Sequence, residues 1–240
     1  MKVIVSPASL DEVEVVLEEG ADVLDLKNPA EGSLGAPLPC EVRSAAALAR
    51  RRRVPLSVAL GDLAFRPGTA ALAAFGAACA GAEYVKVGLH EVASRAEATA
   101  LLEAVVQAVR AASPDVRVVA AGYADRARCG GLAPGDLVRA ARASGCRVAL
   151  LDTAVKDGRS LLDVLEPEDL REFTRAARAE GLHSALSGSL RVEHLSHIAR
   201  AGPDFVGVRG GVCEDGERRG RISRARLRAF LAAARRGEAG

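Results

Sequence analysis

Residues 81–88, which read GAEYVKVG, show the pattern that decides the fold of this chain. The glycine follows an alanine-rich stretch at residues 69–80, as is typical of a helix that ends there, and an apolar run begins within two residues. The same order of helical stretch, glycine and apolar run recurs at Gly20, Gly145, Gly181 and Gly202. The chain therefore alternates helices with strands, as a parallel α/β protein does.

Eight strands follow from this pattern. We expect them at residues 2–5, 22–27, 55–60, 83–88, 116–121, 147–152, 182–187 and 204–208. Each strand and the helix after it take about 30 residues, as in a TIM barrel. No G-x-G-x-x-G follows the first strand and no P-loop is present, which disfavours the main alternative, a doubly wound open sheet. The sequence predicts one α/β domain, a (β/α)8 TIM barrel over residues 1–240.

Composition excludes several classes of function. The net charge is only +2, from 33 basic and 31 acidic residues, so the strongly basic surface of a nucleic-acid-binding protein is not expected. Tryptophan is absent and aromatic residues make up 3%, which disfavours base-stacking surfaces. No apolar run approaches the roughly 18 residues of a membrane span, and no signal peptide is evident. We expect a cytoplasmic protein without nucleic-acid or membrane partners.

Cysteine and histidine give no sign of a metal or disulfide. The five cysteines are scattered, without a C-x-x-C pair, and are interpreted as reduced thiols. The four histidines do not have the spacing of metal ligands. His90, just past the fourth strand, is interpreted as a surface residue rather than a proton shuttle. We therefore expect neither a metal nor an organic cofactor.

Lysine is rare, and its placement is informative. Only four of the 33 basic residues are lysines. Arginine stays protonated, whereas lysine can lose its proton and attack a carbonyl carbon. The period of two in a strand directs Asp25, Lys27 and Lys86 into the barrel, while Asp152 ends the sixth strand and Lys156 follows in the next loop. We expect these five side chains to meet at the C-terminal ends of the strands, where barrel active sites lie.

Two interpretations fit this cluster. In the first, ion pairs such as Asp25 with Lys27 only neutralise buried charge. In the second, repulsion among three crowded lysines lowers the pKa of at least one of them and produces a Schiff-base nucleophile. We favour the second interpretation.

Three loops are candidates for phosphate binding. Barrels often hold phosphate on backbone N–H groups after strands seven and eight, where this chain has glycines and an arginine. The loop at residues 28–37 would give a second anion site, although an ordinary turn-rich connection fits it equally well. The residues expected to bind phosphate are Gly32, Ser33, Ser187, Gly188, Ser189, Arg209, Gly210 and Gly211.

Five segments, DLKNPAEGSLGAP, GAEYVKVGL, LLDTAVKDGRSLLD, LSGSL and VGVRGGVC, resemble the (5-formylfuran-3-yl)methyl phosphate synthases. The resemblance covers essentially the whole chain. It implies a barrel enzyme that condenses two glyceraldehyde 3-phosphate molecules into the phosphorylated furan precursor of methanofuran, releasing phosphate and water. It also implies Lys27 as the Schiff-base lysine and Lys86 as the proton acceptor, with Asp25, Asp152 and Lys156 as supporting charges. The expected partner is a small phosphorylated aldehyde.

Two other functions also fit these residues. One is a lysine-dependent aldolase of the deoxyribose-phosphate type, which uses two lysines and an aspartate but lacks the DLKNP loop. The other is a noncatalytic barrel that binds a sugar phosphate, in which the lysines only neutralise the ligand. The apolar, alanine-rich helices expected on the outside are compatible with a homo-oligomer.

Overall fold

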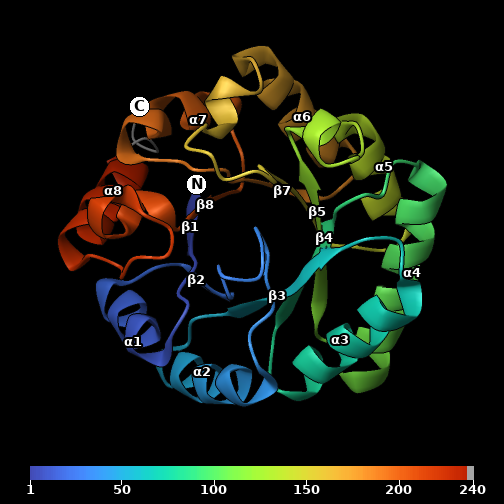
Figure 1. Cartoon of the computed structure of the whole chain (residues 1–240), viewed down its shortest axis with the longest axis horizontal. Coiled ribbons are helices and arrows are strands. Elements are labelled where there is room, and N and C mark those ends of the chain that lie inside the picture. Colours follow the sequence, from blue (N-terminus) through green and yellow to red (C-terminus); the bar gives the residue numbers. More distant parts are fainter. Residues whose placement is uncertain (237–240) are drawn as a thin grey trace.

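The computed structural model describes residues 1–236, which form a closed barrel of eight parallel strands ringed by eight α-helices (Figure 1). Each strand pairs with the next, and β1 pairs with β8. The strands are β1 (Lys2–Val5), β2 (Val23–Leu26), β3 (Leu56–Leu63), β4 (Tyr84–Leu89), β5 (Arg117–Tyr123), β6 (Val148–Asp152), β7 (His183–Leu186) and β8 (Phe205–Val208). The predicted TIM barrel is confirmed. The end of the predicted domain, residues 237–240, lies outside the described residues.

The helices alternate with the strands and cover the outside of the barrel. They are α1 (Leu10–Glu19), α2 (Pro39–Arg52), α3 (Pro67–Cys79), α4 (Arg95–Ala112), α5 (Pro134–Ala143), α6 (Pro167–Ala179), α7 (Leu195–Ala201) and α8 (Arg224–Arg236). The five glycines that marked helix ends all have positive φ, between 65° and 107°. This left-handed conformation turns the chain out of each helix at little steric cost. In the part that the structure describes, no helix is both long and apolar enough to span a bilayer.

The strands lie within two residues of their predicted limits at every end except one. β3 runs to Leu63 rather than residue 60, because its pairing with β4 shifts register between Ala59 and Asp62. The shift brings Asp62 to the hydroxyl of Tyr123, which donates a short hydrogen bond to it from the end of β5. Such bulges lengthen and re-aim a strand in ways that hydropathy alone does not indicate.

Apolar side chains fill the molecule in two layers. The larger layer lies between strands and helices, and a smaller one lies inside the barrel. Leu34, from the loop after β2, is fully buried in the inner layer with Tyr123 and Cys129, and its carbonyl accepts from the Gly61 N–H at 2.9 Å. Figure 1 shows this blue segment, between β2 and β3, extending into the barrel opening. The loop therefore occupies part of the opening on the side of β3 and β5.

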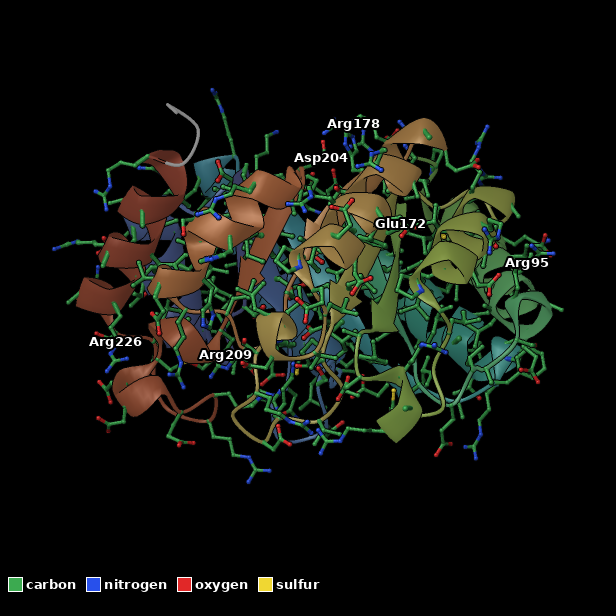
Figure 2. All side chains as sticks on the ribbon, turned by 90° about the horizontal axis from the view of Figure 1, so that it is seen from above. Arg95, Glu172, Arg178, Asp204, Arg209 and Arg226 are labelled. Atoms are coloured by element: carbon green, nitrogen blue, oxygen red, sulfur yellow. The ribbon has the colours of Figure 1, made fainter. Side chains whose placement is uncertain are left out.

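All strands point in one direction, so their C-terminal ends meet at one end of the barrel. In Figure 2, Asp204 precedes β8 near the top, whereas Arg209 follows β8 further down, so the C-terminal ends face the bottom of that view. Arg226, in the first turn of α8, lies at this same end. The loops that follow the strands form the candidate site here.

Candidate active site

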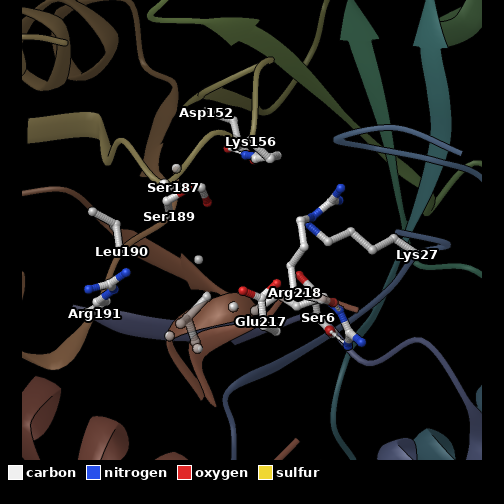
Figure 3. A pocket seen from close by; sticks show the side chains of 18 of the residues that line it. Ser6, Lys27, Asp152, Lys156, Ser187, Ser189, Leu190, Arg191, Glu217 and Arg218 are labelled. Carbon is white, nitrogen blue, oxygen red and sulfur yellow. Dashed lines mark hydrogen bonds and ion pairs between the residues drawn. The ribbon is translucent and has the colours of Figure 1, made fainter. Parts of the chain in front are cut away.

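A cavity of about 340 Å³ opens at the C-terminal ends of the strands (Figure 3). It lies toward β1, β7 and β8, away from the part of the opening that Leu34 occupies. Its volume is that of a small-molecule site. Of the predicted site residues, those that line it are Lys27, Lys86, Asp152, Lys156, Ser187, Gly188, Ser189, Arg209, Gly210 and Gly211. Asp25 is buried next to it, bonded to Lys86.

Two lysine–aspartate pairs are built into the wall of this cavity. Lys86 Nζ lies 2.7 Å from Asp25 Oδ2, and the Ser6 hydroxyl donates to the same oxygen at 2.8 Å. Asp25 Oδ1 is buried without a hydrogen-bond partner among the described residues. On the other side, Lys156 Nζ lies 2.6 Å from Asp152 Oδ1. The predicted convergence of lysines and aspartates at the ends of β2, β4 and β6 is confirmed.

Of the three lysines that line the cavity, Lys27 is the one that forms no ion pair within residues 1–236. Only 7% of it is exposed, and no acceptor among residues 1–236 lies within hydrogen-bond distance of its ammonium group. The expected pair between Asp25 and Lys27 does not form, because Lys86 occupies that carboxylate. Figure 3 shows the Lys27 side chain extending into the cavity.

The environment of Lys27 lowers its pKa to about 7. Burial is the largest cause, because it penalises the charged ammonium form. Asp152 opposes this shift, whereas the positive charges of Lys86 and Lys156 add to it. Repulsion among the lysines therefore contributes as expected, but it is weaker than desolvation. Near neutral pH a large fraction of Lys27 is the free amine.

Both aspartates remain charged despite being buried. Burial raises the pKa of Asp152, but Lys156 and Lys27 outweigh it and lower the pKa to about 2. Burial acts in the same way on Asp25, and the charges of Lys86 and Lys27 keep its pKa below the ordinary value. The cavity thus has two fixed carboxylates, two paired ammonium groups and one amine that can be neutral.

The loops after β7 and β8 contribute cavity-lining residues whose backbone N–H groups form no hydrogen bond among the described residues. We call the N–H groups of Gly188, Ser189, Gly210 and Gly211 the amide cluster, and none of them has an acceptor among the described residues. The two loops are in close contact: a Cβ added to Gly211 would lie 2.2 Å from the carbonyl oxygen of Leu190. Free N–H groups gathered in this way can bind an anion.

Arg209 has a different environment from the one predicted. Its guanidinium donates to Glu12 and to the Ser6 carbonyl, both at 2.8 Å, and also to the carbonyls of Arg218 and Gly220. All three nitrogen atoms are therefore engaged within the protein. The buried Arg209–Glu12 ion pair connects the segment after β8 to the start of α1. The Arg209 guanidinium, which was expected to bind phosphate, is therefore already hydrogen-bonded within the protein.

Gly32 and Ser33 also differ from expectation. Neither lines the cavity. The Ser33 N–H donates to Asp62 at 2.6 Å and the Ser33 hydroxyl to the Thr153 carbonyl at 3.0 Å, so these groups hold the loop in place. A carboxylate at this position disfavours a phosphate, because like charges repel. An anion site on this stretch of backbone is not present in this structure.

Comparison with known proteins identifies the family of the chain. The sequence model of the family described as 4-HFC-P synthase matches residues 3–231. The chain belongs to the 4-HFC-P synthase family. Relatives named (5-formylfuran-3-yl)methyl phosphate synthase include those of Archaeoglobus fulgidus, 44% identical over 93% of this chain and 95% of the relative, and Methanothermobacter thermautotrophicus, 45% identical over 95% and 96%. Membership in this family makes the chain an enzyme, a synthase.

Solved structures support the fold of this 4-HFC-P synthase family member. The 3-hexulose-6-phosphate synthase of Salmonella typhimurium superposes with a TM-score of 0.66 at 16% identity, covering 99% of this chain and 100% of that one. Deoxyribose phosphate aldolase from Aeropyrum pernix has a TM-score of 0.63 at 16% identity, covering 96% and 88%. At such identities the likeness concerns the barrel alone.

Sequence reasoning missed two arginines of this family member. Arg191 and Arg218 both line the cavity, from the segments after β7 and after β8. Arg218 is half-buried, and its guanidinium donates to the carbonyls of Pro29 and Gly32. The basic stretch at residues 218–221 was the available signal, but in a chain with 29 arginines it does not stand out.

Proposed function

We propose that this protein is a (5-formylfuran-3-yl)methyl phosphate synthase that joins two glyceraldehyde 3-phosphate molecules through a Schiff base on Lys27. The observation that carries this proposal is the buried Lys27 amine, unpaired and with its pKa lowered to about 7, in a cavity that also presents the amide cluster. The names of the relatives support the product. Its use as the furan precursor of methanofuran is what the resemblance of the sequence implies.

Each member of the cluster has a role in this mechanism. The neutral Lys27 amine attacks the aldehyde carbon, and loss of water gives an imine. The imine acidifies the adjacent carbon, from which Lys86 accepts a proton, and the resulting enamine attacks the second aldehyde. Lys86 can accept this proton only as a neutral amine. We infer that its own proton goes to the hydroxyl group that leaves as water when the imine forms, while Asp25, at 2.7 Å, holds Lys86 in position. Lys156 and Asp152 supply charge beside the reacting oxygens. Hydrolysis of the imine frees Lys27, and loss of phosphate and water completes the furan ring.

The amide cluster gives one of the two phosphates a binding site. Its N–H groups donate without adding a titratable charge, which suits a doubly charged phosphate. Lys156 lines the same cavity and provides positive charge. A noncatalytic sugar-phosphate barrel would need these anion donors but not an unpaired, neutral lysine, and this difference favours catalysis.

The test is to trap the imine. The protein is incubated with glyceraldehyde 3-phosphate, reduced with borohydride and digested, and the modified peptide is located by mass, while an unreduced sample is monitored for furan absorbance. We expect one adduct on Lys27 together with furan product. In Lys27→Arg, which keeps the positive charge but has no nucleophilic amine at this pH, both should be lost.

The matched control is Lys2→Arg, which changes the exposed lysine at the start of β1 and should leave the adduct and the product at the wild-type level. An adduct without furan would indicate another lysine-dependent aldolase. Binding of the substrate without any adduct would contradict the proposal and favour the noncatalytic barrel.

A further inference from the structure

We propose that Arg218 binds the phosphate of the second aldehyde and thereby ties the loop at residues 28–37 over the reacting lysine. This inference rests on the proposed function, which requires two phosphorylated substrates in one cavity. The amide cluster accounts for one phosphate. The site expected for the other, at Gly32 and Ser33, does not face the cavity.

Arg218 joins two loops that lie far apart in the sequence. One terminal nitrogen donates to the Pro29 carbonyl at 3.1 Å and the other to the Gly32 carbonyl at 2.7 Å. Its own carbonyl accepts from Arg209 Nε at 2.7 Å. Arg209 is in turn held by Glu12. The backbone of Arg218 is therefore held by Arg209, and its side chain contacts the loop that follows Lys27.

The guanidinium of Arg218 has donors to spare. An arginine has five N–H groups, and the two carbonyls use two of them. No carboxylate among the described residues forms an ion pair with it, although the group is partly buried; burial lowers its pKa, and the attraction of Asp152 opposes that shift. A partly desolvated, unpaired guanidinium that lines a cavity is suited to a doubly charged phosphate.

The position of Arg218 assigns it to the second phosphate rather than the first. In Figure 3, Lys27 extends into the cavity from the right and Arg218 from below, whereas Ser187 and Ser189, beside the amide cluster, lie on the left. A substrate held by the amide cluster and one held by Arg218 would approach Lys27 and its imine from different sides. Their reacting carbons would then meet between the two anion sites.

The carbonyl contacts give this site a second consequence. Lys27 directly precedes the loop that Arg218 holds, and the Lys27 N–H donates to the Pro7 carbonyl at 3.2 Å. A phosphate on Arg218 would strengthen the link between the segment after β8 and this loop. Binding of the second substrate would therefore restrict access of water to the imine, which hydrolysis would otherwise destroy.

The experiment separates the two phosphates by comparing adduct formation with product formation. Arg218→Gln removes the charge and leaves the Lys27 amine and the amide cluster intact. We expect the borohydride adduct of glyceraldehyde 3-phosphate to form at nearly the wild-type rate, while the KM for furan formation rises about tenfold or more, the usual loss for a hydrogen bond to a charged group. Arg218→Lys keeps the positive charge but has one ammonium group in place of the two terminal nitrogens of the guanidinium. It should give an intermediate KM.

Arg219→Gln is the matched control, since it removes the same charge from the exposed neighbouring residue and should leave KM within about twofold of wild type. Unphosphorylated glyceraldehyde is a second control: when it replaces the second substrate, Arg218→Gln should cost little, because no phosphate is left to bind. An equal loss with both acceptors would overturn the inference in favour of a purely structural role.

The two proposals fail in different ways. If the wild-type protein forms neither adduct nor furan, the proposed function fails. If the wild type is active and Arg218→Gln retains the wild-type KM, only the role of Arg218 fails. Should Arg218→Gln not fold, a wild-type KM in Arg218→Lys would contradict the inference equally well.

Discussion

At the scale of single residues, the environment of one side chain sets the chemistry of the cavity. Lys27, Lys86 and Lys156 share a wall, yet two of them are paired with carboxylates at 2.7 and 2.6 Å and only Lys27 is not. Burial costs an ammonium group most when no counter-charge is in contact, and burial is the largest cause that lowers the pKa of the unpaired Lys27 to about 7. By binding the other two lysines, the two aspartates leave unpaired the lysine that we propose as the nucleophile.

The pH dependence of adduct formation follows from this pKa. Because the nucleophile that we propose is the neutral Lys27 amine, the rate of adduct formation should rise with pH through about 7 and level off above it, far below the ordinary lysine pKa. In Asp152→Asn the midpoint should fall further, because Asp152 is the strongest influence that raises the Lys27 pKa. Borohydride trapping with unphosphorylated glyceraldehyde, which has no titrating phosphate, measures both profiles. A midpoint near 10, or one that rises in Asp152→Asn, would contradict this account.

At the scale of elements, close contact between the loops after β7 and β8 creates the amide cluster. Gly211 permits that contact, since any Cβ there would collide with the Leu190 carbonyl oxygen at 2.2 Å. Backbone atoms cannot rotate aside as a flexible side chain can. The absence of a side chain at Gly211 therefore sets the separation of the two loops. That separation in turn sets the geometry of the four N–H groups.

Gly211→Ala should therefore separate the two loops. We expect the protein to lose about 1–3 kcal/mol of unfolding free energy, as overpacked sites do, and to bind inorganic phosphate several-fold more weakly. Urea denaturation and calorimetric titration measure the two effects. The control is Gly68→Ala in α3, where no atom lies within 4 Å of the added Cβ, so phosphate affinity should not change. Wild-type phosphate affinity in Gly211→Ala would exclude the amide cluster as the site.

At the scale of the whole molecule, the Arg209–Glu12 pair connects the two ends of the chain across the β1–β8 seam. Glu12 accepts from the Ala8 and Ile222 N–H groups as well as from Arg209, which also holds the Ser6 carbonyl. The contacts join residues up to 210 positions apart. They close the barrel and also set the position of the segment that contains Arg218.

Arg209→Met should destabilise the whole barrel. Removing one partner leaves the Glu12 carboxylate buried without its counter-charge, which costs about 3–5 kcal/mol of unfolding free energy. Arg171→Met, which breaks the exposed pair with Glu168, should change it by less than about 1 kcal/mol. Urea denaturation of both variants measures the difference. Equal stability of the two variants would show that the buried pair does not secure the seam.

The sequence by itself determined the order of elements, the barrel and the inward direction of Asp25, Lys27 and Lys86. These features depend on local rules: glycine ends a helix, and side chains alternate along a strand. The C-terminal location of the site followed from the barrel, because parallel strands end on one face. Each of these inferences needs only neighbouring residues or a general property of the fold.

Tertiary structure alone decided which groups pair. Asp25 could have met either Lys27 or Lys86, and only the barrel register brings Lys86, 61 residues away, to 2.7 Å. In the same way Glu12 engages the fork of Arg209, and Asp62 takes the N–H of Ser33, across separations of 197 and 29 residues. A charged side chain binds the partner that folding places within a few ångströms, and sequence periodicity indicates the face on which it lies but not that distance.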